Sequence, residues 1–385
     1  MTLVNYGKHF VSNDDIQNVN KVLRSNFLTQ GKAVEKFEAN LKKYLSAKYC
    51  TVVSSGTAAL YILGKALNWK KDDHVITTPN SFVATSNCIV YSGATPVFVD
   101  IDKDTGNICT KKLELKVNEL KKRKKKIKAI IAIDYGGCPS DWPKINSIAK
   151  KRNIILINDS CHSLGSSINK NRSYAMKYAD FATFSFHPVK PITTGEGGAI
   201  ISKDKTIDQK LKLLRTHGIY KNSKKKEWHQ DMKVFGYNYR ITDFQCALGI
   251  SQLKKINQYN IKRKKIADIY KKELININYI KTQSVPKNFE SSYHLFPIKI
   301  NFRKLKIDKN IFFKKLLKMG IKLQVHYIPI YRHSYYKKKF KLKTLNFPNT
   351  EQFYNQVVSL PIYYNLSKKT QLYVINCLKK IFFKS

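Results

Sequence analysis

The sequence has few features of membrane, secreted or disulfide-bonded proteins. None of its apolar runs reaches the roughly 18 to 20 residues that would cross a bilayer. The N-terminus lacks the basic and then apolar segments of a signal peptide. The seven cysteines are scattered, without a close pair that would indicate a disulfide framework or a zinc site. We therefore expect a cytoplasmic protein with no membrane contact and no metal site.

Acidic residues and arginine are also scarce, so the chain is strongly basic. Its 71 lysines and arginines face only 26 aspartates and glutamates, which gives a formal net charge of +45. This charge makes a nucleic-acid-binding protein one candidate class. However, only nine basic residues are arginine, the side chain that most often reads base edges. Base composition explains the excess of lysine equally well, because lysine has A/T-rich codons. We do not expect nucleic acid as the partner, although the field would attract an anionic small molecule.

The first two thirds of the chain alternate helical patterns with short apolar runs. Helices are expected over residues 12–23, 32–45 and 244–253, and strands over 50–53, 74–78, 96–100, 129–133, 154–159, 181–186 and 198–201. Apolar strands separated by helices predict an α/β fold, with a mainly parallel sheet between helices. From about residue 258 the pattern changes to lysine-rich helices with fewer strands. We expect a large cofactor-binding domain over residues 1–257 and a smaller C-terminal α/β domain over residues 258–385.

Lys190 is the most informative single residue. It ends a short apolar run and is followed at once by Pro191, two threonines and a cluster of glycines. Such a context holds an amine out of bulk water and lowers its pKa. A neutral amine of this kind forms a Schiff base with an aldehyde cofactor. The alternative interpretation is a strand–turn–strand segment with an incidental lysine.

Asp159 supplies a second part of the predicted chemistry. It lies at the end of a buried strand, where a carboxylate is costly unless it meets a positive charge. A protonated pyridine nitrogen would be such a charge and would keep the ring an electron sink. His162 would share a face with Asp159 in a helical turn and would reach the ring or its phenolic oxygen. The alternatives are a helix-capping aspartate and a merely packed histidine.

Three further segments suggest contacts to a flat phosphate-bearing ligand. Ser55–Ala59 passes from a strand into a helix N-terminus, where backbone amides favour an anion, and Ser185 offers a hydroxyl to the same phosphate. Phe82 follows a strand end and would stack on a planar ring, with core packing as the alternative. Asn238 lies in a turn-rich segment before an apolar helix, and the alternative there is an asparagine turn with an Asp243 cap.

Together these segments identify a resemblance to a known family. Residues 55–60, 159–165, 185–198 and 236–249 occur in the order and spacing of the DegT/DnrJ/EryC1/StrS family of pyridoxal-phosphate sugar aminotransferases, which the chain resembles nearly end to end. The resemblance implies the fold type I of pyridoxal-phosphate-dependent transferases, with a seven-stranded, mainly parallel sheet. It also implies the catalytic residues Lys190 and Asp159, and cofactor contacts from Thr57, Ala58, Phe82, His162, Ser185 and, from the second subunit of a homodimer, Asn238. Tyr6 and His326 are implied on the sugar-nucleotide side.

The same resemblance implies a substrate class. Residues 77–85, 190–194 and 324–331 look most like the branch that aminates C4 of UDP-linked 4-keto-6-deoxy-N-acetyl sugars with L-glutamate. Many family members have glutamate before the aspartate, whereas this chain has Asn158, as that branch does. A family member acting on another 3-keto or 4-keto sugar remains an alternative. Sugar dehydratases of this fold have histidine in place of the lysine, so Lys190 argues against that activity.

Overall fold

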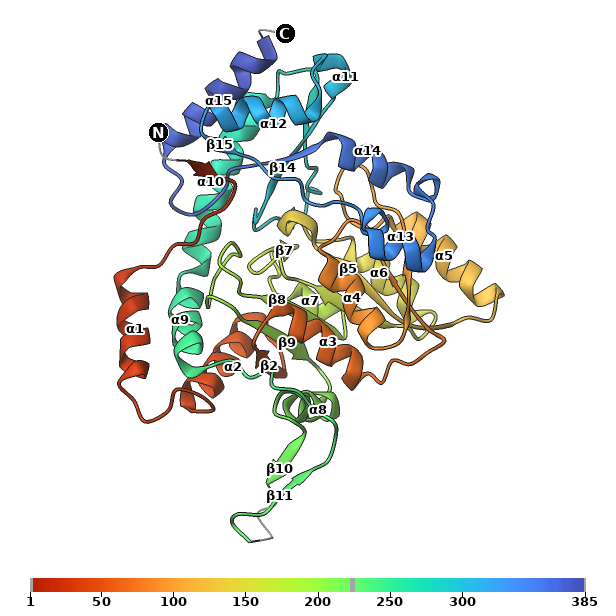
Figure 1. Cartoon of the computed structure of the whole chain (residues 1–385), viewed down its shortest axis with the longest axis vertical. Helices are drawn as coiled ribbons and strands as arrows, with labels where there is room; N and C mark the ends of the chain where they lie inside the picture. Colours follow the sequence, from red (N-terminus) through yellow and green to blue (C-terminus); the bar gives the residue numbers. More distant parts are fainter. Residues whose placement is uncertain (1–2, 222–225, 384–385) are drawn as a thin grey trace.

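The computed structural model describes residues 3–221 and 226–383. Its centre is a seven-stranded sheet in the order β2-β9-β8-β6-β5-β3-β4 (Figure 1). The strands are β2 (Tyr49–Val53), β3 (Asp73–Thr77), β4 (Thr95–Phe98), β5 (Lys126–Ile133), β6 (Ile155–Asp159), β8 (Phe181–Ser185) and β9 (Gly198–Ser202). β9 runs antiparallel to both of its neighbours, and the other pairs are parallel. The predicted mainly parallel sheet of seven strands is confirmed.

Both faces of this sheet are buried, which explains why its strands are apolar throughout. Within β5, Ala129 and Ile131 pack into one core and Ile130 and Ala132 into another, because successive side chains alternate between faces. The first face carries α3 (Gly56–Ala66), α4 (Val83–Tyr91) and α8 (Lys205–Arg215). The second carries α2 (Lys32–Leu45), α5 (Thr110–Lys122), α6 (Trp142–Lys150), α7 (Tyr174–Tyr178) and α9 (Asp243–Lys254).

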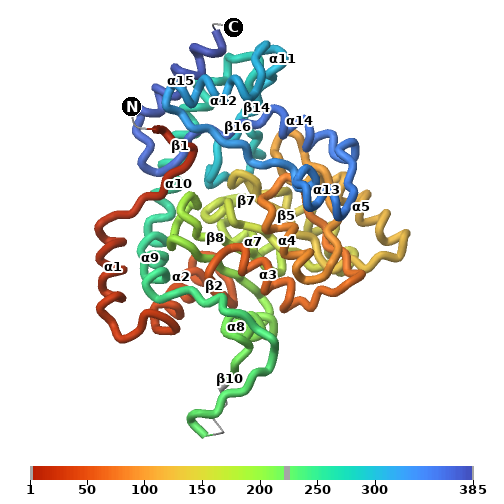
Figure 2. The backbone as a smooth tube through the Cα atoms, in the orientation of Figure 1, coloured from red at the N-terminus to blue at the C-terminus, as the bar shows by residue number. Residues whose placement is uncertain are grey.

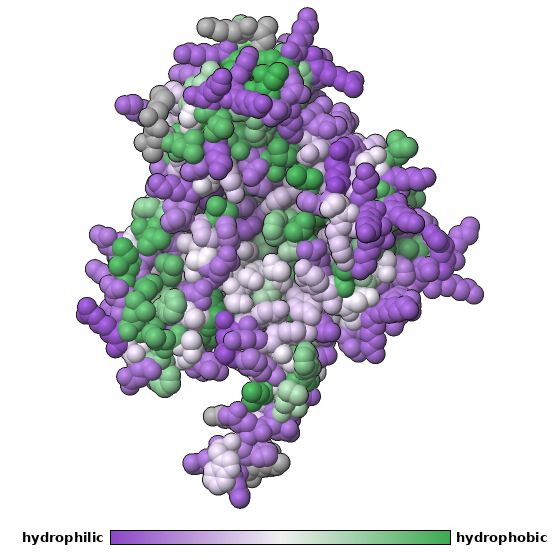
Figure 3. Space-filling model, in the orientation of Figure 1, coloured by the Kyte–Doolittle hydropathy of each residue, from purple (hydrophilic) through white to green (hydrophobic). Residues whose placement is uncertain are grey.

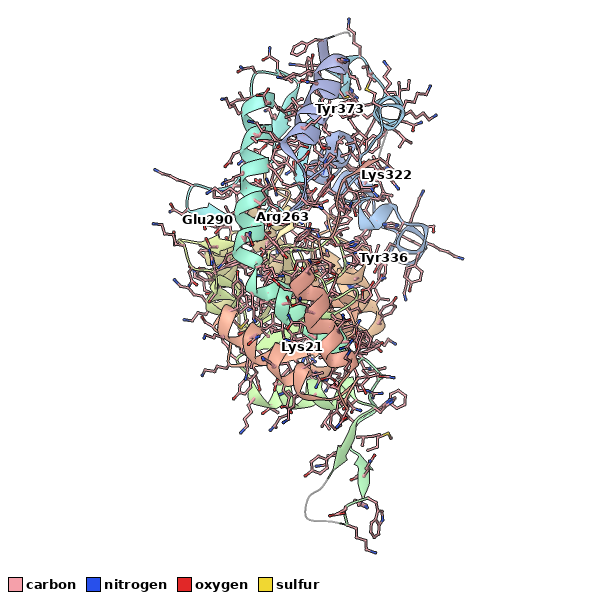
Figure 4. All side chains as sticks on the ribbon, turned by 90° about the vertical axis from the view of Figure 1, so that its left-hand side faces the viewer. Lys21, Arg263, Glu290, Lys322, Tyr336 and Tyr373 are labelled. Atoms are coloured by element: carbon pink, nitrogen blue, oxygen red, sulfur yellow. The ribbon has the colours of Figure 1, made fainter. Side chains whose placement is uncertain are left out.

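The C-terminal part has a separate core around a three-stranded antiparallel sheet. Its strands are β12 (Ile280–Thr282), β14 (Phe296–Ile300) and β16 (Val357–Leu360). The helices around it are α10 (Ile256–Leu274), α11 (Phe302–Leu305), α12 (Lys309–Lys318) and α15 (Lys368–Phe383). In Figure 4, α10 runs lengthwise through the molecule, with Arg263 near its middle. The boundary expected near residue 257 falls inside this continuous helix.

The N-terminal residues pack with the C-terminal part. β1 (Val4–Asn5) pairs in parallel with β15 (Ile321–Lys322), and Val4 belongs to the C-terminal core. Figure 2 shows β1 in the upper part of the molecule, together with α12 and α15 of the C-terminal part. The large domain expected over residues 1–257 includes residues 4–5, whose strand pairs with the C-terminal part.

Several short elements complete the fold. They are α13 (Ser334–Phe340), α14 (Pro348–Gln356), the pair β7 (Ser167–Ile168) and β13 (Phe289–Glu290), and the 3₁₀ turns η1 (Tyr135–Gly137), η2 (Ile330–Arg332) and η3 (Thr344–Asn346). Among the described residues, no helix is both long enough and apolar enough to cross a bilayer.

Two elements lie on the outside and expose apolar side chains. Helix α1 (Asn13–Leu23) begins with a capping box between Ser12 and Asp15 and packs against α9. Figure 3 shows apolar side chains gathered over α1. The hairpin of β10 (Ile219–Lys221) and β11 (Gln230–Met232) projects away from the body of the protein (Figure 1). Trp228 and Phe235, at 76% and 79% exposure, lie in this hairpin segment.

Asp100 joins the end of β4 to the start of α14. Its buried carboxylate accepts hydrogen bonds from the Thr350 amide (2.9 Å) and hydroxyl (2.7 Å), and it pairs with Lys112 at 2.6 Å. Burial by itself would raise the pKa of Asp100, but the hydrogen bonds from Lys112 and Thr350 leave this pKa lowered overall. The ionised carboxylate therefore stabilises the folded state.

We expect Asp100→Ala to lower the free energy of unfolding by about 2–3 kcal/mol at pH 7, because buried donors lose their acceptor. Asp308→Ala, which removes the exposed cap of α12, is the matched control and should cost about 1 kcal/mol. Since the folded pKa is lowered, the Asp100 contribution is complete above the unfolded carboxyl pKa of about 3.9. It should decline as the pH falls from there through the folded pKa. Urea unfolding at several pH values measures the free energies of unfolding of the wild type and of Asp100→Ala. A difference between these two free energies that stays unchanged down to the lowest pH would contradict the account.

Candidate active site

A cavity of about 780 Å³ opens at the carboxyl ends of the parallel strands. This is the edge at which α/β sheets bind ligands. Chain segments far apart in the sequence meet there, and they bring together Tyr6, Thr57, Phe82, Asp159, His162, Ser185, Lys190 and His326. Of the ten residues expected from the sequence, Ala58 and Asn238 do not line the cavity of their own chain.

Lys190 lies in the turn after β8, where its amide donates a hydrogen bond to the His187 carbonyl at 2.9 Å. Within the described residues, its ammonium group has no ion-pair partner. Burial lowers the pKa of Lys190, and the nearby Cys161 and Asp159 oppose this shift only in part. A lowered pKa increases the fraction of neutral amine, which is the nucleophilic form.

Asp159 ends β6 and is almost completely buried. Its carboxylate accepts hydrogen bonds from the Thr85 hydroxyl on α4 (2.7 Å) and from the Cys161 amide (3.3 Å). Both donors are neutral, so the buried negative charge still needs a cation. Residues 160–165 form turns and not a helix. The expected helical turn is therefore wrong, and so is the alternative in which Asp159 caps a helix.

His162 is buried and bonded at both ring nitrogens. The Gly136 amide lies 3.3 Å from Nδ1, and the Tyr327 hydroxyl lies 2.9 Å from Nε2. Burial holds the pKa of His162 well below its usual value, and the charge of Lys190 lowers it further. The imidazole is therefore neutral. Tyr327 was not among the predicted site residues, although it directly follows His326 in a segment that the sequence had marked.

The N-terminus of α3 forms a cradle beside Ser185. A Cβ atom on Gly56 would lie 2.8 Å from the Ser185 Cβ, so only glycine allows this approach. The first intrahelical bond runs from Ala59 to Ser55, which leaves the Gly56 and Thr57 amides at the open end of the helix. Ala58 is different, because its amide donates to the Ser55 hydroxyl at 3.0 Å and its side chain is buried.

Phe82 is the N-cap residue of α4 and is 57% exposed on the cavity wall, so core packing does not explain it. Its ring centroid lies 6.2 Å from that of Tyr327. On the far wall, the Tyr6 and His326 rings lie 5.0 Å apart. His326 Nδ1 lies 2.8 Å from the Ser359 hydroxyl. Burial and the charge of Lys190 lower the pKa of His326 to about 3, so this histidine is also neutral.

Asn238 lies on the exposed segment that follows the projecting hairpin and forms a bridge with Thr216. The alternative in which Asp243 caps α9 is wrong. Thr242 caps that helix, and the Asp243 carboxylate accepts from the Gly31 and Ala33 amides at the start of α2. The position of Asn238 is therefore not explained by capping.

A seven-stranded sheet with a half-buried lysine and a buried carboxylate at its edge is the arrangement expected of an aminotransferase. Residues 10–379 match the DegT/DnrJ/EryC1/StrS aminotransferase family, and the chain belongs to this family. It is 41% identical to the UDP-4-amino-4,6-dideoxy-N-acetyl-beta-L-altrosamine transaminase of Campylobacter jejuni serotype O:23/36, over 98% of this chain and 97% of that protein. The Helicobacter pylori enzyme of the same name is 36% identical over the same shares.

Solved structures agree with this family. The chain superposes on Helicobacter pylori PseC, an aminotransferase involved in the biosynthesis of pseudoaminic acid, with a TM-score of 0.91, 34% identity and full coverage of both chains. It superposes on Spr1654 from Streptococcus pneumoniae, solved in a PLP-form, with a TM-score of 0.90, 28% identity and 99% coverage of each chain. The predicted fold class, a transferase of fold type I, is confirmed by these neighbours.

Proposed function

We propose that the protein is a pyridoxal-phosphate-dependent aminotransferase acting on a nucleotide sugar. Its substrate would be UDP-2-acetamido-2,6-dideoxy-β-L-arabino-hexos-4-ulose, aminated at C4 with L-glutamate as donor. The product would be UDP-4-amino-4,6-dideoxy-N-acetyl-β-L-altrosamine, used in pseudaminic acid biosynthesis. The observation that carries the reaction type is that the half-buried Lys190, which has no ion-pair partner among the described residues, lies in one cavity with the buried Asp159. The choice of sugar is supported by relatives of 36–41% identity that bear this activity in their names.

The residues present fit each part of pyridoxal phosphate. The α3 N-terminus, with Thr57 and the adjacent Ser185 hydroxyl, offers donors to a phosphate. Phe82 offers an exposed aromatic face to the ring. The buried Asp159 carboxylate lacks the cation that a protonated ring nitrogen would provide. We propose no phosphate contact from the Ala58 amide, because that amide already donates to the hydroxyl of the N-cap residue Ser55.

When bound, the cofactor supplies the electron sink for the carbon that loses a proton. Lys190 would bind the aldehyde carbon of the cofactor covalently. Once the amino donor had displaced it, Lys190 would move a proton as a general base and acid. Asp159 would keep the ring nitrogen protonated, with its orientation fixed by Thr85 and the Cys161 amide. Phe82 would shield one face of the site from water. The donor leaves as 2-oxoglutarate, and the sugar ketone becomes an amine.

We further propose a homodimer with shared active sites, to which Asn238 of each chain contributes in the other subunit. The exposed apolar side chains on α1 and on the projecting hairpin support a second copy as the partner. Asn238 follows this hairpin in the chain and does not line the cavity of its own chain, so it is free to reach the cavity of a second copy. Among the described residues that line the cavity, Lys190 is the one lysine or arginine, so a sugar nucleotide's diphosphate would need cations from elsewhere. Tyr6 and His326 remain the proposed contacts to the sugar.

A panel of UDP-linked 4-keto and 3-keto sugars, each incubated with glutamate, tests this proposal. Mass spectrometry should show the exchange of a ketone oxygen for an amine, and NMR should show the altrosamine configuration at C4. Preferred amination of a different sugar would replace the proposed substrate with another nucleotide sugar of the same family. Absence of amination with every sugar, together with a gel shift that weakens as salt is raised, would favour the nucleic-acid-binding alternative instead.

A further inference from the structure

Tyr327 occupies a central position in the cavity that the sequence had not predicted. Its ring lies between Phe82, 6.2 Å away, and His162, 6.0 Å away with an interplanar angle of 23°. Its hydroxyl lies 2.9 Å from His162 Nε2. Within the described residues, this is its one hydrogen-bond partner.

The direction of the hydrogen bonds around His162 follows from the donors available. A backbone N–H can only donate, so the Gly136 amide requires that His162 Nδ1 accept. The neutral imidazole then carries its proton on Nε2 and donates it to the Tyr327 oxygen. The hydroxyl proton of Tyr327 is left over, and it is available to an acceptor in the cavity.

The acceptor expected there is part of the ligand. In pyridoxal the phenolic oxygen and the aldehyde group are attached to neighbouring ring carbons. Because Lys190 would bind the aldehyde carbon covalently, the phenolic oxygen would lie near Lys190. His162 lies within electrostatic range of Lys190, and both line the cavity with Tyr327. His162 itself has no proton left for this oxygen, because its single N–H is already donated.

We propose that Tyr327, and not His162, donates the hydrogen bond to the phenolic oxygen of the bound cofactor, and that His162 is a positioning residue that orients the Tyr327 hydroxyl. This inference rests on the proposed function and revises the expected role of His162. In this series of hydrogen bonds each group donates to the next: the Gly136 amide to His162, His162 to the Tyr327 hydroxyl, and that hydroxyl to the ligand.

The absorbance of the cofactor joined to Lys190, titrated with pH, measures this hydrogen bond without measuring turnover. A donor to the phenolic oxygen stabilises the deprotonated chromophore more, because that oxygen then carries more negative charge. Tyr327→Phe should therefore raise the chromophore pKa by about one unit, the size of one charged hydrogen bond. The other titratable groups that line the cavity stay in place in every variant; they are Tyr6, Asp159, Cys161, His187, Glu196, His294, His326 and His333.

Variants at His162 separate the two possible donors. His162→Gln is the matched control, because its amide can accept from Gly136 and donate to Tyr327, so the chromophore pKa should stay as in the wild type. His162→Leu should raise this pKa by less than Tyr327→Phe does. The double variant Tyr327→Phe/His162→Leu should show no further rise beyond Tyr327→Phe alone, because both changes interrupt one connection.

The opposite pattern would overturn the inference. If His162 donated directly, His162→Leu would give the full rise and Tyr327→Phe would leave the chromophore pKa unchanged. Thermal unfolding of each variant identifies any that fails to fold. If His162→Leu does not fold, the chromophore pKa values of Tyr327→Phe and His162→Gln still decide which residue donates to the phenolic oxygen. A wild-type protein that forms no chromophore would contradict the proposed function itself, so the two failures are distinguishable.

Discussion

Lys190→Ala is expected to lower turnover of glutamate and the sugar nucleotide by about 10⁴-fold or more. This lysine would hold the cofactor covalently and would also move the proton between donor and cofactor. General acid–base catalysis alone contributes about 10²–10⁴-fold, and the loss of covalent attachment adds to this. The burial that lowers the pKa of Lys190 is what suits it to both tasks. Steady-state kinetics with glutamate and the keto sugar measures the effect.

Lys122→Ala provides the control for a general effect of losing one lysine from so basic a chain. Lys122 is exposed at the end of α5 and is not among the residues that line the cavity, so its loss should leave turnover unchanged. Thermal unfolding should show that Lys190→Ala still folds, since the buried amine has no ion-pair partner among the described residues. Turnover by Lys190→Ala close to that of the Lys122 variant would rule out the proposed role.

Asp159→Asn is expected to have the second largest effect, with kcat lowered by about 10²–10³-fold. The amide keeps the shape of the carboxylate and can still accept from the Thr85 hydroxyl. It removes the negative charge that would keep the ring nitrogen protonated, so the electron sink is weakened. Stopped-flow measurement of the glutamate half-reaction isolates this step from binding of the sugar nucleotide.

Thr85→Val is the matched control for loss of the Asp159 charge. It removes the 2.7 Å hydrogen bond to Asp159 but leaves the carboxylate in place, so the loss in kcat should be about tenfold. The account requires the asparagine variant to be slower than the valine variant. Equal rates for the two would mean that orientation of residue 159, and not its charge, supports the reaction.

The sheet was predictable because its strands are short apolar runs that are buried on both faces. The Lys190 and Asp159 positions were predictable for a related reason, since Asp159 ends such a run and Lys190 follows another after a few residues, so both lie near strand ends. The pairing of β1 with β15 was not predictable. It joins residues 4–5 to residues 321–322, which are far apart in the sequence, and so short a pair has no periodic pattern to detect.

Contacts that depend on distant backbone groups were also beyond the sequence. Ala58 lies in the marked Ser55–Ala59 segment, but only the structure shows that its amide is occupied by the Ser55 hydroxyl. Tyr327 is one of many tyrosines, and its importance arises because it meets His162, which is 165 positions away. Residue type and local sequence pattern do not predict such a long-range contact.

The most direct test of the account is to reduce the purified protein with borohydride and to map the modified peptide by mass spectrometry. We expect the protein to be yellow as purified, and we expect a single pyridoxyl label on Lys190 after reduction. The chain has 62 lysines, so a label confined to this one would identify the site without ambiguity. Protein that takes up no pyridoxal phosphate, or a label on a different lysine, would contradict the central claim.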